Sequence, residues 1–119
     1  MKNNFIKRIC KWNQDRGNLI GEIDKNLEQE LLDEELEEFK DAESAVDELD
    51  AILDIIFVSI GTLHKMGLIP QDIETGINIV CTANEAKLAI KNDSGKIVKS
   101  SDFVNPEPEL QKILNKTKG

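Results

Sequence analysis

One stretch of the chain, residues 50–63, constrains the fold more than any other. Its apolar residues cover nearly every direction at helical pitch, so it predicts a helix that is buried on most sides. Asp50 and Asp54 interrupt this stretch and lie four residues apart, on one face of such a helix. A buried carboxylate without a partner is costly, and no Lys or Arg occurs between Asp50 and His64. The partner of these aspartates must therefore come from elsewhere in the chain, or be a bound cation.

Apolar spacing and capping residues predict helices along most of the remaining chain. The expected helices cover residues 3–15, 24–45, 44 or 47 to 65, 70–91 and 106–115. Residues 96–99 are expected to form a short strand or an extended arm. The pattern predicts an all-α fold, a single domain over residues 1–119 in which four main helices form a bundle together with a short C-terminal helix.

Acidic residues of the second expected helix share a stripe with apolar ones. At about 100° per residue, the stripe contains Leu27, Leu31, Glu34, Glu35, Glu38, Ala42 and Ala45. Most acidic runs of this kind are solvated helix surfaces. Here the short connection favours antiparallel packing against the third helix, which brings the three glutamates toward Asp50 and Asp54. Like charges about 4 Å apart repel by roughly 4 kcal/mol at an effective dielectric constant near 20, so the cluster predicts a hard divalent cation, Mg²⁺ or Mn²⁺.

Composition excludes several classes of function. The net charge of −8 argues against non-specific nucleic-acid binding, and the stretch 50–63 is too short and too acidic for a membrane span. The N-terminus lacks the apolar run of a signal peptide, and Cys10 and Cys81 form no metal-binding pattern, so we expect a cytoplasmic protein with reduced thiols. A di-iron centre is disfavoured because His64 is preceded by Gly61, three residues before it, and not by a glutamate.

Four segments together carry a family resemblance. They are Glu34-Glu35-Leu36-Glu37-Glu38 followed by Asp41-Ala42; Asp50 to Val58 with Gly61 and Gly67; Asn84 to Leu88; and Gly95 to Lys99 with a proline before the last helix. The first resembles the EExxE motif of the MazG-like, all-α nucleoside triphosphate pyrophosphohydrolases, and the second resembles their second acidic helix. The other two are similar to the phosphoribosyl-ATP pyrophosphohydrolase-like branch, which is common among phage-encoded proteins.

The similarity covers residues 12–114 and departs from the family pattern in one place. The usual ExxD motif would place its glutamate at Ala51. Asp50, or the pair Asp47 and Asp50, can take the place of that glutamate because Asp47, Asp50 and Asp54 share one helix face.

The resemblance implies a magnesium-dependent enzyme that hydrolyses a nucleoside triphosphate, or a related nucleotide, between its α- and β-phosphates and releases pyrophosphate. The implied metal ligands are Glu34, Glu35, Glu38, Asp50 and Asp54, with Asp47 as an alternative. Glu35 and Glu38 are the expected catalytic groups, and Glu35 is expected to orient or deprotonate the attacking water.

Other residues are expected to hold the phosphates and the base. Lys87 and Lys96 are the expected phosphate contacts, with Asn84 and Lys99 beside them. Trp12 either stacks on the base or belongs to the core.

The third helix also bears on assembly. Because it is apolar on nearly all sides, it needs more cover than one small bundle supplies, and we expect a homodimer or a dimer of dimers. Two alternative functions remain open. One is a non-catalytic acidic helical module that regulates or binds a partner and does not respond to divalent ions. The other is a dUTPase-like specificity on the same scaffold.

Overall fold

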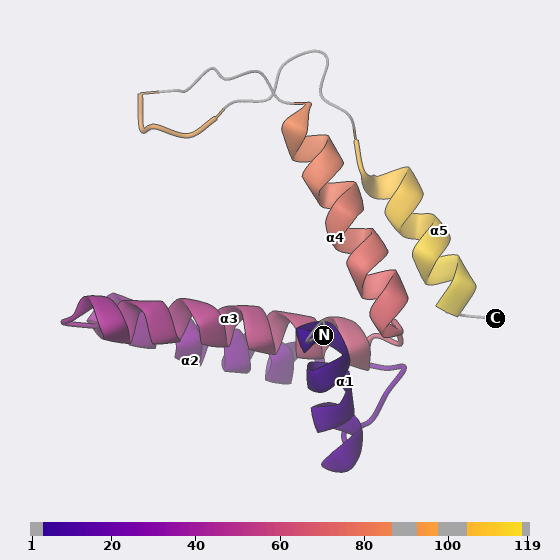
Figure 1. Cartoon of the computed structure of the whole chain (residues 1–119), viewed down its shortest axis with the longest axis horizontal. Helices are drawn as coiled ribbons and strands as arrows, with labels where there is room; N and C mark the ends of the chain where they lie inside the picture. The colour runs from indigo at the N-terminus through magenta and orange to yellow at the C-terminus, as the bar shows by residue number, and fades with distance from the viewer. Residues whose placement is uncertain (1–3, 87–92, 98–104, 118–119) are drawn as a thin grey trace. The chain divides into compact units, whose positions relative to one another are not determined.

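The computed structural model describes residues 4–86, 93–97 and 105–117. These ranges contain five α-helices (Figure 1). They are α1 (Phe5–Asp15), α2 (Lys25–Asp41), α3 (Ala45–Lys65), α4 (Pro70–Glu85) and α5 (Glu107–Thr117). No strand occurs within these described ranges, which confirms the predicted all-α class. The chain groups into two compact units, which divide between Ile73 and Glu74.

Side-chain caps fix where the first three helices begin. The side-chain oxygens of Asn4, Asp24 and Ser44 each accept a hydrogen bond from a backbone amide three residues further on. Asp24 was the expected cap, and Ser44 is the cap of α3 in preference to Asp47. The expectation that the second helix extends to Ala45 is wrong: α2 ends at Asp41, because Ser44 already caps the next helix and two helices cannot share these residues.

The remaining boundaries lie near their expected places. Gly67 has a φ of 104°, a left-handed conformation that ends α3. Pro70 then begins α4, which ends at Glu85 and not near residue 91; residues 87–92 lie outside the described part of the chain. Residues 96 and 97 are not helical, and the rest of the expected arm is likewise outside it.

In the first unit α2 and α3 lie side by side (Figure 1) and run antiparallel, as expected. Near the start of α2, Glu28 accepts a hydrogen bond of 2.7 Å from Thr62 Oγ1 and one of 2.8 Å from Lys65 Nζ, both near the end of α3. At the other end of the pair, Glu38 lies near Asp54. The two helices are therefore held by an ion pair at one end and joined by a short connection at the other.

The helix α1 packs on the second half of α3 through a buried polar network. Asn13 Nδ2 donates to Gly61 O at 3.0 Å and lies 3.1 Å from His64 Nδ1, while Asn18 Nδ2 donates to Asn13 Oδ1 at 3.0 Å. Apolar burial completes the core of this unit, which comprises Ile6, Ile9, Cys10, Ala51, Ile60, Leu68 and Ile73.

The helix α3 is much less covered than its sequence predicts. Its buried residues are Ala51, Ile60, Gly61 and His64. A row of apolar side chains is exposed instead: Val46 (67%), Leu49 (59%), Leu53 (53%) and Ile56 (45%). The expectation of a helix buried on most sides is wrong for one copy of the chain, because α1 and α2 cover two faces of α3 and leave a third open.

The second unit contains most of α4 and all of α5. Ile113 Cδ1 and Leu110 Cδ2 of α5 lie 3.8 and 3.9 Å from the position that a Cβ atom would occupy at Gly76 of α4. Ala83 and Ile113 are buried. Among the described residues, no single helix is long and apolar enough to cross a membrane. Of the described helices, only α3 and α4 counted together, with the break between them, reach the length and apolar composition of a membrane span.

Candidate metal centre

Three carboxylates from two helices converge in the first unit. Glu35 and Glu38 stand one turn apart on α2, and Asp54 faces them from α3. One ligand oxygen from each lies within 4.8 Å of the other two. Glu35 and Asp54 are half-buried, and Glu38 is exposed. Three oxygen ligands at this spacing form a site of the kind that Mg²⁺ or Mn²⁺ prefers.

The crowding of these acids shifts their proton affinities. Burial, a hydrogen bond with Glu38 and the charges of the neighbouring carboxylates together raise the pKa of Glu35 to about 7, and burial is the largest of these causes. Burial also raises the pKa of Asp54, with smaller contributions from the charges of Asp50 and Glu38. Glu35 Oε2 is buried and has no hydrogen-bond partner in the described structure. The described side chains around the centre supply no positive charge that would favour its ionised form.

Glu28, a second glutamate of α2, shows how a cationic partner satisfies a carboxylate in this helix pair. Glu28 precedes Glu35 by seven residues, which places both on one face of α2. Glu28 is 5% exposed, yet its carboxylate is satisfied by Lys65 and Thr62. Within the described residues, no lysine or arginine forms an ion pair with Glu35. The contrast supports a bound cation at the Glu35 end, and the residues present fit a divalent ion.

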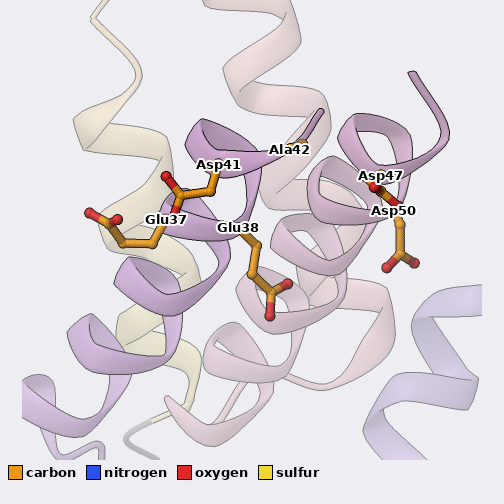
Figure 2. Close-up of a pocket in the computed structure, with 6 residues that line it drawn as sticks. All are labelled: Glu37, Glu38, Asp41, Ala42, Asp47 and Asp50. Atoms are coloured by element: carbon orange, nitrogen blue, oxygen red, sulfur yellow. The ribbon is translucent and has the colours of Figure 1, made fainter. Parts of the chain in front are cut away.

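The other predicted ligands lie around this centre. Asp47 and Asp50 of α3 line an open pocket together with residues of α2, and Figure 2 shows Glu38 projecting between the two helices. Glu37 and Asp41 extend from the far side of α2 (Figure 2). Asp50 is close enough for its charge to raise the pKa of Asp54, whereas Asp47 is an exposed residue in the first turn of α3.

Glu34 takes a different position from its neighbour Glu35. It is exposed, and it lines a shallow pocket with other acids of α2. Its charge nevertheless raises the pKa of Glu35. The structure thus brings together Glu35, Glu38 and Asp54, places Asp50 next to them, and leaves Glu34 and Asp47 at the margin.

Trp12 lies beside the centre, between core and solvent. Its ring meets Phe57 edge-on, with ring centroids 5.3 Å apart at an interplanar angle of 86°. The Arg16 guanidinium covers the ring at 4.3 Å, and the Trp12 side chain remains 39% exposed. Phe57 follows Asp54 by three residues, so Trp12 contacts α3 about one turn from the acidic cluster.

The predicted phosphate contacts fall in or near the second unit. Asn84 is exposed, and its Nδ2 donates to Val80 O at 2.9 Å. Lys96 is exposed as well. Lys87 and Lys99 lie outside the described residues, and all four stay predictions.

Sequence reasoning missed three features of this site. The Glu28–Lys65 ion pair could have been suspected, because Glu28 shares heptad spacing with Glu35. The contact between Asn13 and His64 joins residues 51 positions apart and leaves no local signal. The contact of Arg16 with the Trp12 ring joins residues four positions apart, and this i,i+4 spacing is a local signal that could have suggested it.

A comparison with known families gives an independent result. The family described as phosphoribosyl-ATP pyrophosphohydrolase matches residues 15–80, more than half of the chain. The matched range contains α2, α3 and every carboxylate of the candidate centre. No individual curated protein matches the chain.

Proposed function

The chain belongs to the phosphoribosyl-ATP pyrophosphohydrolase family, and we propose that it hydrolyses a nucleoside triphosphate, or a related nucleotide, between the α- and β-phosphates. The products would be the monophosphate and pyrophosphate. The observation that carries the proposal is the cluster of Glu35, Glu38 and Asp54, in which a buried carboxylate oxygen has no partner among the described residues. The order of the sequence segments supports the phage-type branch of the family.

The donor set fits Mg²⁺ or Mn²⁺ held by Glu35, Glu38 and Asp54, with Asp50 as the adjacent further ligand. When bound, such an ion would neutralise phosphate oxygens and lower the pKa of a water molecule. Glu34 and Asp47 lie at the margin of the carboxylate cluster and would affect the bound ion through their negative charge.

The protein's own groups would position the nucleotide and the water. Glu35 belongs to the cluster and has a carboxylate oxygen without a partner among the described residues, so it can orient the attacking water or accept its proton. Glu38, one turn after Glu35, projects between α2 and α3 and can bind the metal ion from there (Figure 2). Lys87 and Lys96, with Asn84 and Lys99, remain the proposed phosphate contacts, and Trp12 the proposed contact for the base.

The test measures pyrophosphate release from a panel of triphosphates, including dUTP, with Mg²⁺. Glu38→Gln and Asp54→Asn should each lower the rate by about a hundredfold or more, since each removes a ligand charge. Glu37→Gln is the matched control: it makes the same change next to Glu38, on a side chain that extends away from the centre (Figure 2), and should stay within about twofold of wild type. Release at the wild-type rate in Glu38→Gln and Asp54→Asn would contradict the proposal.

We also propose that the enzyme is a homodimer, or a dimer of dimers, in which the apolar row on α3 packs against a second copy. Val46, Leu49, Leu53 and Ile56 repeat at heptad spacing, as in the seam between two packed helices. Leu36 (53% exposed) and Phe39 (40% exposed) of α2 add apolar surface in the same unit. An exposed face of this kind commonly marks a protein interface, and identical rows can pair with each other across a two-fold axis.

A further inference from the structure

One row of residues on α3 changes chemistry halfway along its length. At heptad spacing it consists of Asp50, Asp54, Phe57, Gly61 and His64. The second half of the row is covered by α1, through the hydrogen bonds of Asn13 with Gly61 and its contact with His64. The first half carries the acids of the candidate centre. Phe57 marks the boundary between the covered half and the acidic half.

Arg16 is held at this boundary. The Arg16 guanidinium lies 4.3 Å from the centroid of the Trp12 ring, and the Trp12 ring in turn contacts Phe57. Phe57 is about one helical turn from Asp54, so these contacts link Arg16 to the neighbourhood of the acidic cluster. Arg16 Nη1 also donates to the Trp12 carbonyl oxygen at 3.4 Å. An arginine stacked on an aromatic face keeps the N–H groups at its edge available to a ligand.

The charge of Arg16 is not used inside the described structure. Lys65 pairs with Glu28, and Lys11 pairs with Asp15 on α1, the helix that Arg16 directly follows. No carboxylate among the described residues pairs with Arg16. In a chain with a net charge of −8, a cationic side chain near the acidic centre would favour the binding of a polyphosphate there.

We propose that Arg16 is a substrate-binding residue whose guanidinium contacts the pyrophosphate portion of the nucleotide held at the α2–α3 centre. This inference rests on the proposed function. The planar guanidinium matches two phosphate oxygens at once, which a lysine cannot do. Because Arg16 occupies a face of Trp12, a base stacking on that face must displace it, and the phosphate contact is available without that displacement.

The chain contains a single tryptophan and no tyrosine, so its intrinsic fluorescence reports on Trp12 alone. Inorganic pyrophosphate titrated in the presence of Mg²⁺ should change this fluorescence in the wild-type chain, as Arg16 shifts on the ring. Isothermal titration calorimetry gives the affinity in each variant, including those in which the fluorescence change is lost. Arg16→Gln should bind pyrophosphate about tenfold to a hundredfold more weakly, and Arg16→Lys should recover part of the loss.

Lys11→Gln is the matched control, since it removes one positive charge at an exposed site of α1, five residues before Arg16. Its pyrophosphate affinity should stay within about twofold of wild type. Unchanged thermal melting of the metal-free variants would show that the fold is intact. Hydrolysis with Mg²⁺ gives a second readout, in which Arg16→Gln should lower kcat/KM by a similar factor.

Two results would overturn the inference in distinguishable ways. If the wild-type chain hydrolyses nucleotides and Arg16→Gln binds pyrophosphate as tightly as Lys11→Gln does, Arg16 does not contact the phosphates and the proposed function stands. If the wild-type chain neither hydrolyses triphosphates nor binds pyrophosphate with Mg²⁺, the proposed function is wrong and the role of Arg16 is wrong with it.

Discussion

Replacing Glu35 by glutamine is expected to stabilise the metal-free chain and to remove its response to Mg²⁺. Burial and the neighbouring carboxylates raise the pKa of Glu35 from 4.5 to about 7, so its ionised form is disfavoured in the folded state. Glutamine has the same shape, is neutral at every pH, and can still donate a hydrogen bond to Glu38. A substitution inside the centre should therefore strengthen the fold while it destroys the site.

The magnitude follows from the linkage between proton binding and folding. A carboxyl group with a higher pKa in the folded state contributes its full stability below the unfolded pKa of 4.5, and that contribution is lost as the pH rises through about 7. Each pKa unit corresponds to about 1.4 kcal/mol. Because Glu35 is only half-buried, solvent screening reduces the full value for this shift, and the wild-type chain should lose on the order of 2 kcal/mol over this range. Glu35→Gln avoids that loss at pH 8 and should show no advantage near pH 4.5.

The assay is thermal and urea unfolding in EDTA and in Mg²⁺. At about 100 times its dissociation constant, Mg²⁺ should stabilise the wild-type chain by about 2.7 kcal/mol, and Glu35→Gln should gain far less because it has lost one of the proposed metal ligands. Glu28→Gln is the matched control on the same face of α2. It leaves Lys65 without its partner, which should cost about 3 kcal/mol, and it should keep the response to Mg²⁺.

Two outcomes would refute this reasoning. The first is a Glu35→Gln chain that is less stable than wild type at pH 8 in EDTA, because the carboxylate would then be contributing to the fold. The second is equal stabilisation of Glu35→Gln and wild type by Mg²⁺, which would place the metal elsewhere.

A charge placed in the apolar row of α3 should separate the proposed dimer. In size-exclusion chromatography with light scattering, Leu53→Asp should have the molar mass of a monomer, whereas Leu19→Asp, at a site 71% exposed, should keep the molar mass of the wild type. Asp50→Asn should lower the hydrolysis rate by about tenfold to a hundredfold, and Asp47→Asn should change it by less than about threefold, because only Asp50 acts directly on Asp54. Burial lowers the pKa of His64, so the free energy of unfolding should decrease as the pH falls below 6.5, and a comparison of urea unfolding between wild type and His64→Gln should show that this slope is lost in the variant.

The helices could be predicted from the sequence because their start and stop signals are local. Ser44, Gly67 and Pro70 each act within one turn. The end of α2 could not be predicted from periodicity alone, because Ala45 continues the stripe of α2 while Ser44 begins a new helix. Where two local signals compete, the side-chain cap prevailed over the repeat.

The acidic centre could be predicted as a cluster, but its membership could not. Consecutive residues of a helix point about 100° apart, so of Glu34 and Glu35 only one can face α3 squarely. Which one does so depends on the rotation of α2, and that rotation is set by contacts such as Glu28 with Lys65, far from the motif. Asp47 and Asp50 lie one turn apart on α3, so the choice between them depends on which turn of α3 lies against the glutamates of α2.

The arrangement of the α2–α3 pair explains how three carboxylates that repel one another stay close together in the fold. The carboxylates of Glu35, Glu38 and Asp54 repel one another, and this repulsion would separate two free helices. The connection at residues 42–44 joins the helices beyond one side of the centre, and the bonds of Glu28 with Thr62 and Lys65 hold them beyond the other. The acids lie between two fixed points, so opening the centre requires breaking a buried ion pair or unwinding a helix end. The carboxylates are thereby held close together by the fold itself, so a divalent ion that bound there would require little further ordering of the two helices.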